Sequence, residues 1–124
     1  MKTNKKRKIL ISICTPEEFK QDLLSGFKRA EAGLLPKDPV HKLYFTSETD
    51  LFGTLSPKRM ELLKFLKKYG PLSCRKLAAK LKRSYANVYN DVKELLKLDL
   101  VEKNKELLLF VPWDELNVAV PLAA

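Results

Sequence analysis

Near both ends of the chain, hydrophobic residues occupy every second position, a spacing typical of half-buried strands. In the first segment they are Ile9, Ile11 and Ile13, and in the last segment they are Leu116, Val118 and Val120. We therefore predict a strand over residues 8–14 and another strand in the C-terminal segment. An unpaired strand exposes an edge that associates readily, so we expect these strands to pair, with each other or across a dimer axis.

The first helical pattern follows directly after the N-terminal strand. Thr15 and Glu18 form a capping-box sequence at its start. Apolar residues then recur at positions 19, 23, 27 and 30, which predicts a helix with one buried face, and Gly33 ends it. The next apolar stretch, LYFTS at 43–47, fits either a short strand or an anchoring segment.

Three further helical patterns each begin after a serine that can cap the first backbone amides. These serines are Ser56, Ser73 and Ser84. Gly70-Pro71 ends the first of the three helices, and the basic pair Lys82-Arg83 separates the other two. After the third, residues 100–103 and 107–111 predict a β-hairpin with its turn at Asn104-Lys105.

The helix that begins after Ser84 has two chemically different faces. At about 100° per residue, its core side holds Val88, Val92, Leu95 and Leu96. The opposite side carries cations, amides, a small residue and a flanking phenol: Arg83, Ala86, Asn87, Tyr89, Asn90, Lys93 and Lys97. Helix stability alone does not favour Asn or Tyr. An asparagine amide can, however, pair bidentately with the adenine edge in the major groove, so this face is interpreted as a DNA-reading surface.

The positive charge of the chain is concentrated around these helices. The net charge is +9. Residues 56–105 contain 14 Lys and Arg against 5 Asp and Glu, whereas the other 74 residues contain 10 of each kind. Clustered positive charge favours a phosphate backbone or an acidic protein surface as the partner.

The segment LSPKRMELLKFLKKYGPLSCRKLAAKLKRSYANVYNDVKELLKLDLVEK (55–103) resembles the winged-helix regulators of the MarR-like kind. Within them it is most similar to the TumA-type antitoxins, small prokaryotic regulators that accompany toxin genes. The upstream stretches GFKRAEAG and LYFTSETDLFGTLSPKR are similar to that group as well. The resemblance implies DNA binding by a recognition helix and a wing, autoregulation and dimerisation.

The residues that carry the resemblance lie at the caps, the core and the recognition helix. They are Ser56-Pro57, Arg59, Leu62-Leu63, Leu66, Gly70-Pro71, Ser73, Leu77-Ala78, Arg83, Asn87-Val88, Asp91-Val92, Leu95 and Leu100-Val101. Two positions depart from the pattern. Asp99 stands where glycine is common because the chain turns through a left-handed conformation, and the wing turn lacks a glycine.

We therefore predict an α+β, mostly helical fold with three parts. A winged helix-turn-helix spans residues 51–112, preceded by a strand-helix extension at 1–50 for dimerisation or partner binding, and followed by a C-terminal strand at 113–124. The predicted DNA contacts are Ser73, Arg75, Lys76, Lys82, Arg83, Ser84, Tyr85, Ala86, Asn87, Tyr89, Asn90, Lys93, Lys103 and Lys105. Asp91, an acid beside this surface, is expected to pair with a nearby Arg or Lys.

A winged-helix unit covers only a half-site, so we expect a homodimer on a pseudo-palindromic operator. The predicted dimer or partner interface consists of Ile9, Ile11, Ile13, Phe19, Leu23, Phe27, Trp113, Leu116, Val118 and Val120. Two alternatives remain open: the strands complete a monomer core, or a cognate toxin completes the sheet. Trp113 fits a core position as well as a dimer anchor.

The function expected from these features is sequence-specific binding of double-stranded DNA by a transcriptional regulator, the autoregulating antitoxin of a toxin–antitoxin pair. The alternative is a protein-interaction module that neutralises a toxin or dimerises without specific DNA readout. RNA binding is less favoured, because no sheet with stacking aromatic residues is indicated.

Catalysis, cofactors and metal ions find no support in the sequence. His41 has no Cys or carboxylate at ligand spacing, and there is no glycine-rich phosphate loop. Cys14 and Cys74 lack a CxxC arrangement and are interpreted as free thiols. The basic start is followed by a short apolar run without a signal cleavage site, and no apolar run reaches the roughly 20 residues of a membrane span. We predict a cytoplasmic protein that is not an enzyme.

Overall fold

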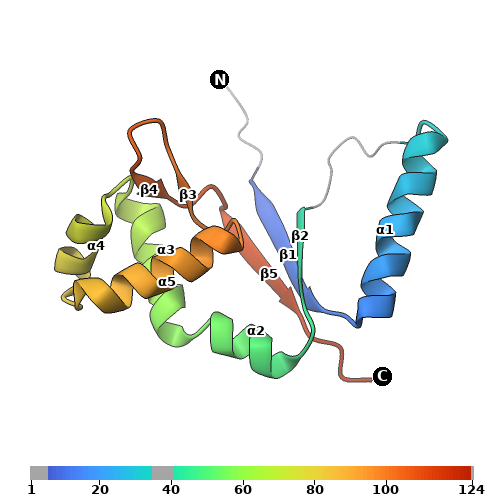
Figure 1. The fold of residues 1–124 in the computed structure, drawn as a ribbon, viewed down its shortest axis with the longest axis horizontal. Helices are drawn as coiled ribbons and strands as arrows, with labels where there is room; N and C mark the ends of the chain where they lie inside the picture. The colour runs from blue at the N-terminus through green and yellow to red at the C-terminus, as the bar shows by residue number, and fades with distance from the viewer. Residues whose placement is uncertain (1–5, 35–40, 124) are drawn as a thin grey trace. The chain divides into compact units, whose positions relative to one another are not determined.

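The computed structural model describes residues 6–34 and 41–123. The fold is α+β, as predicted, with five helices and two small sheets among the described residues. The chain divides into two compact units, whose elements are labelled in Figure 1. Unit 1 comprises residues 1–7 and 54–114, and unit 2 comprises residues 8–53 and 115–124. The chain passes between the units after residues 53 and 114, whereas the predicted boundaries lie after residues 50 and 112.

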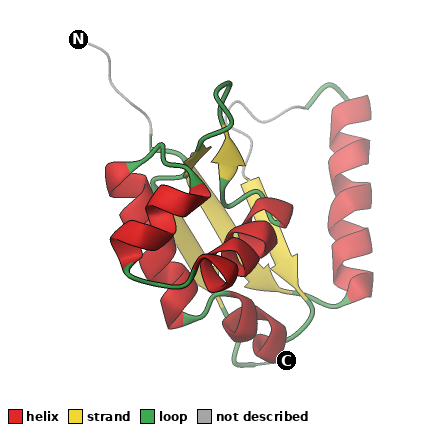
Figure 2. Cartoon of the chain, turned by 60° about the vertical axis from the view of Figure 1, so that its left-hand side comes forward, coloured by secondary structure: helices red, strands yellow, loops and turns green. Residues whose placement is uncertain are grey.

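Unit 2 contains a parallel three-stranded sheet, which is yellow in Figure 2. Its strands are β1 (Lys8–Ile13), β2 (His41–Phe45) and β5 (Glu115–Ala119), in the order β2-β1-β5. Ile9 lies opposite His41 on one side and Leu116 on the other. Both predicted terminal strands are confirmed, and they pair with each other within one chain. The open alternative at LYFTS is resolved as a strand.

Helix α1 (Pro16–Glu31) connects β1 to β2. Its capping box is confirmed: the Thr15 hydroxyl accepts a hydrogen bond from the Glu18 amide, and the Glu18 carboxylate accepts one from the Thr15 amide, both at 3.1 Å. The prediction that its apolar face is buried is wrong, because no residue of α1 is buried. The helix contacts β2 at the edge of that face, where the Phe19 and Tyr44 rings meet edge to face at 5.6 Å.

Helix α2 (Glu48–Thr54) follows β2 and is not among the predicted elements. The hydroxyl of Ser47 accepts a hydrogen bond from the amide of Asp50 at 3.1 Å, which satisfies one of the first amides of this helix. Leu51 is its one buried residue. A helix of two turns offers too few apolar positions to establish a period, so its pattern is not distinguishable from that of a loop.

Unit 1 combines three helices with a short hairpin: α3 (Pro57–Tyr69), α4 (Cys74–Leu81), α5 (Tyr85–Lys97), β3 (Glu102–Lys103) and β4 (Leu109–Phe110). All three predicted caps are confirmed. The hydroxyls of Ser56, Ser73 and Ser84 accept hydrogen bonds at 3.2–3.3 Å from the amides three residues later. The buried residues of this unit are mainly leucine and valine, among them Leu62, Leu63, Leu66, Leu77, Val88, Val92, Leu95 and Leu100.

The hairpin differs from the prediction in its turn. Its strands are only two residues long, and the loop extends over residues 104–108 instead of a two-residue turn at Asn104-Lys105. The side-chain oxygen of Asn104 accepts hydrogen bonds from the amides of Glu106 and Leu108, both at 2.9 Å. Asn104 thus closes the loop in place of the missing glycine. Leu72 and Leu109 exchange two backbone hydrogen bonds, which attach the hairpin to the segment between α3 and α4.

After α5 the chain turns through a left-handed conformation at Asp99, with φ at 60°, as predicted. The carbonyl oxygen of Asp99 accepts a hydrogen bond of 2.8 Å from the indole N–H of Trp113. Trp113 is buried, and the Arg7 guanidinium lies over its ring at 4.9 Å from the centroid. Trp113 therefore belongs to the interior of unit 1, which corrects its assignment to a dimer or partner interface.

Candidate nucleic-acid interface

Helix α5 shows the two faces predicted from its sequence. Val88, Val92 and Leu95 are buried against the rest of the chain. The predicted DNA-reading side is exposed along Ala86, Asn87, Asn90 and Lys93. The Ser84 hydroxyl caps the start of the helix by accepting from the Asn87 amide at 3.2 Å. This side of α5 therefore presents two amides, a small residue and a cation to the surroundings.

An exposed aromatic cluster lies beside these amides at the start of α5. The Tyr85 and Tyr89 rings stack with their centroids 6.0 Å apart, one helical turn from each other. The Arg75 guanidinium, from the first turn of α4, lies 4.8 Å from the Tyr85 centroid. The stacking orients Arg75, and the two phenols add hydroxyl donors. A guanidinium and phenols in this arrangement suit contact with phosphate oxygens.

The basic residues of the α4–α5 connection divide into two groups. Lys76 is exposed in the first turn of α4, and Lys82 is exposed in a left-handed conformation, with φ at 56°, directly after that helix. Arg83 differs, because its Nη2 donates to an Asp91 carboxylate oxygen at 2.7 Å and its side chain is only 18% exposed. Arg83 is therefore a structural ion-pair partner, and its assignment as a DNA contact is corrected.

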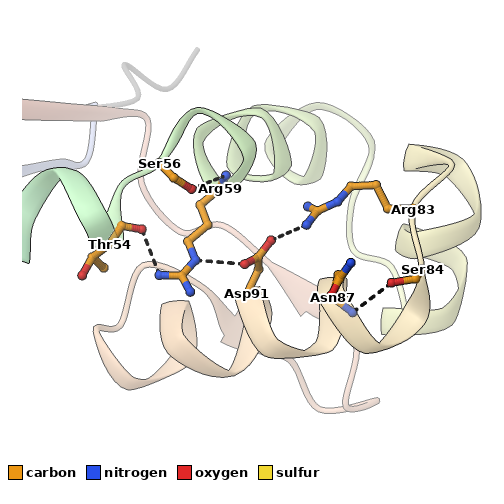
Figure 3. A network of polar contacts seen from close by, with 7 residues as sticks. All are labelled: Thr54, Ser56, Arg59, Arg83, Ser84, Asn87 and Asp91. Carbon is orange, nitrogen blue, oxygen red and sulfur yellow. Dashed lines mark hydrogen bonds and ion pairs between the residues drawn. The ribbon is translucent and has the colours of Figure 1, made fainter.

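Asp91 lies at the centre of a network that joins three elements (Figure 3). Its second carboxylate oxygen accepts from Nε of Arg59, in α3, at 3.0 Å. Nη1 of Arg59 also donates to the carbonyl oxygen of Thr54 at 3.1 Å. The prediction that Asp91 pairs with a nearby Arg or Lys is confirmed. The sequence marks Arg59 only as a residue of the resemblance, because a partner 32 positions away leaves no local signal.

The loop between β3 and β4 carries the remaining predicted contacts. Lys103 and Lys105 are both exposed. Leu107, at the far end of the loop, is 73% exposed and has a φ of 63°. The loop at 104–108, whose conformation the Asn104 hydrogen bonds fix, and the adjoining Lys103 therefore expose two cations and one apolar side chain.

The predicted interface residues occupy different environments. Ile9 and Ile11 are buried within the chain, which removes them from an interface, and Ile13 and Leu116 are half-buried. Val118 is exposed on β5, and Val120 lies one residue beyond this strand. The other three, Phe19, Leu23 and Phe27, are exposed on α1.

The two units carry net charges of opposite sign, so the uneven charge distribution seen in the sequence coincides with the division into units. Unit 1 contains 18 Lys and Arg against 7 Asp and Glu, a net charge of +11. Unit 2 contains 6 Lys and Arg against 8 Asp and Glu, a net charge of −2. The exposed face of α5 therefore belongs to a unit with a large positive excess, which attracts polyanions.

Groups capable of other chemistry are few in the described part of the chain. Residues 6–34 and 41–123 contain no cluster of His, Cys, Asp and Glu that could hold a metal ion, and none of their helices is long and apolar enough to cross a membrane. Cys14 and Cys74 are free and half-buried. Burial raises the pKa of both thiols, which lowers their thiolate content and reactivity.

Comparison with known proteins adds one finding. The model of the protein family HVO_A0114 matches residues 54–118, slightly more than half of the chain. The matched segment covers α3, α4, α5 and the hairpin, and ends within β5. Neither the curated proteins nor the solved structures contain a match to the chain.

Proposed function

The chain belongs to the HVO_A0114 family, and we propose that its unit 1 is a winged helix-turn-helix that binds specific double-stranded DNA as a transcriptional regulator. The order of α3, α4 and α5, followed by a hairpin, is that of a winged helix. In this proposal α5 is the recognition helix, and the loop at 104–108 is the tip of the wing.

The exposed side of α5 carries the proposal. Asn87 and Asn90 are exposed on the side opposite Val88 and Val92, and the helix cap uses the backbone N–H of Asn87 but neither side-chain amide. The side chain of Ala86 beside them is short, so it does not hinder a close approach of the helix to base edges. Asparagine amides at such a position read adenine through its N6 and N7 atoms, whereas a surface chosen for stability would carry better helix formers.

Phosphate contacts would surround this reading face. The residues proposed for them belong to unit 1, and all except the half-buried Ser73 are exposed: Ser73, Arg75, Lys76, Lys82, Ser84, Tyr85, Tyr89, Lys93, Lys103 and Lys105. The net charge of +11 on the unit supports this assignment, since phosphate contacts dominate the affinity of DNA-binding proteins. RNA is less favoured as the ligand, because the exposed aromatic pair lies on a helix and not on a sheet.

The biological role extends this proposal. The resemblance of residues 55–103 to TumA-type antitoxins supports an autoregulating antitoxin that acts in the cytoplasm and binds a cognate toxin. Unit 2 is the part available for a protein partner, because its charge is slightly negative and its helix α1 exposes an apolar face. Toxin neutralisation without specific DNA readout is the alternative function, and the experiment below separates the two.

The test is binding to DNA selected from a random pool, measured by fluorescence anisotropy against a scrambled duplex. Asn87→Ala and Asn90→Ala should each reduce discrimination by about 1–3 kcal/mol and leave the scrambled duplex unaffected. Lys103→Ala and Lys105→Ala should weaken binding to both duplexes and reduce the salt slope by about one each. Lys64→Ala, an equal charge change on α3, is the matched control. Full specificity in both asparagine variants, or a full chain that selects no sequence, would refute the proposed readout.

A further inference from the structure

The ion-pair network around Asp91 lies directly beside the exposed face of α5. Asn87 precedes Asp91 by four residues on this helix, as Figure 3 shows. Their side chains are therefore about one helical turn apart and within about 40° of each other around the helix axis. The network thus contacts α5 at the edge of its exposed face, next to the first of the two asparagine amides.

Asp91 attaches α5 at two points. Its carboxylate accepts from Arg59 of α3 at 3.0 Å and from Arg83, in the connection that leads into α5, at 2.7 Å. The Arg59 guanidinium is itself held in place, because its Nη1 donates to the carbonyl oxygen of Thr54 at 3.1 Å. The side chain of Arg59 is only 19% exposed, so water competes little for these bonds. All four residues belong to unit 1.

The apolar side of α5 does not by itself fix the rotation of the helix about its axis. Val88, Val92 and Leu95 are buried, but hydrophobic attraction is non-directional and determines only which side faces inward. A helix with its side chains has a radius of about 5–6 Å, so a rotation of about 10° moves an amide at its surface by about 1 Å. Hydrogen-bond lengths vary by only about 0.5 Å, so such a movement breaks a bidentate contact to a base.

We propose that Arg59 is a positioning residue for base readout. Through Asp91 it fixes the rotation of α5 that directs Asn87 and Asn90 at base edges, and the directional bonds of a guanidinium are suited to this task. This role rests on the proposed function, because it assigns specificity to a residue outside the proposed DNA contacts.

Stability alone does not account for the network. Apolar residues of similar volume can replace a poorly solvated ion network, often without loss of stability. The network also leaves Nη1 of Arg83 buried and without a hydrogen bond to the described residues, which costs stability. A role in orienting α5 explains why directional bonds are present at this position despite that cost.

The test compares the affinities of each variant for the selected and the scrambled duplex. A variant that is merely less folded loses affinity for both duplexes by the same factor, so the ratio of its affinities is unchanged. Arg59→Met should reduce this ratio about tenfold, within the range that one bidentate contact supplies, and change the affinity for the scrambled duplex less than about threefold. Lys58→Met, an equal charge change at the exposed neighbouring position of α3, should leave the ratio unchanged. The fluorescence of the buried Trp113 checks that each variant is folded.

A double-mutant cycle tests whether Arg59 acts through the asparagine amides. In the Asn87→Ala background, Arg59→Met should reduce the ratio only about threefold, because Asn90 alone remains to be positioned. An unchanged ratio in Arg59→Met, an equal loss in Lys58→Met, or an undiminished effect in the Asn87→Ala background overturns the positioning role and leaves the proposed function intact. An original chain that prefers no sequence refutes the proposed function, and the positioning role with it.

Discussion

Replacing Asp91 with alanine should destabilise unit 1 by about 3 kcal/mol. The Asp91 carboxylate is 14% exposed and accepts two charge-assisted hydrogen bonds, from Arg59 at 3.0 Å and from Arg83 at 2.7 Å. Such bonds contribute about 1.5–3 kcal/mol each, and the partial exposure of all three side chains favours the lower value. The loss is greater than that of a surface pair, because two poorly solvated guanidinium groups remain without their acceptor.

The two partners of this ion pair should not respond equally. Nη1 of Arg83 is buried and makes no hydrogen bond with the described residues. Arg83→Met therefore removes an unsatisfied donor together with the ion pair, and should cost about 1 kcal/mol, well below the cost of Asp91→Ala. Asp91→Asn keeps the shape and one acceptor oxygen, and should fall between them at about 2 kcal/mol. In the Arg83→Met background, Asp91→Ala should cost at least about 1 kcal/mol less than in the original chain.

Trp113 provides the assay. It is the single tryptophan of the chain and is buried in unit 1, so its fluorescence reports the unfolding of this unit in urea. For a unit of this size, a loss of about 3 kcal/mol corresponds to a fall of roughly 12–24 °C in Tm. If Asp91→Ala changed the free energy of unfolding by less than about 0.5 kcal/mol, or Arg83→Met cost as much as Asp91→Ala, the reasoning would be refuted.

Three further predictions concern local features of the fold. Gly70→Ala should lower the free energy of unfolding of unit 1 by about 1–3 kcal/mol, because its Cβ would lie 2.5 Å from the Leu66 carbonyl oxygen; unchanged tryptophan-monitored unfolding would contradict this. Leu107→Gly should raise the free energy of unfolding of unit 1 by about 0.5–1 kcal/mol, because glycine adopts the φ of 63° without steric cost. A lower free energy of unfolding in the same assay would contradict this prediction. The hydrogen bond from the Tyr44 hydroxyl is the main cause that lowers the pKa of Asp22, and the positive charge of Lys42 lowers this pKa further. The ionised carboxylate therefore stabilises the fold at pH values above its ordinary pKa of about 3.9. Asp22→Asn should therefore destabilise the chain at neutral pH. The difference in Tm between this variant and the original chain, followed by far-UV circular dichroism, should shrink as the pH falls through the lowered pKa of Asp22. A Tm difference that does not change with pH would show that the charge of Asp22 does not contribute to stability.

The local elements were accessible from the sequence because their causes lie within a few residues. Each cap depends on a hydroxyl and an amide three positions apart, so Thr15, Ser56, Ser73 and Ser84 all occupy the predicted positions. The two faces of α5 follow from its 3.6-residue period alone. The left-handed turn at Asp99 was expected from the family resemblance, in which glycine is common at this position, and not from the local pattern.

Other features depend on partners that are distant in the chain. Sequence period shows that α1 has an apolar face, but burial depends on whether another element covers it, and none of its residues is buried. Arg83 and Lys82 look alike in the sequence, yet Arg83 is held by Asp91 while Lys82 remains exposed. The parallel pairing of β1 with β5 joins Lys8 to Glu115 across most of the chain. Such pairings are selected by the packing of the whole fold, because no interaction between neighbouring residues distinguishes them from their alternatives.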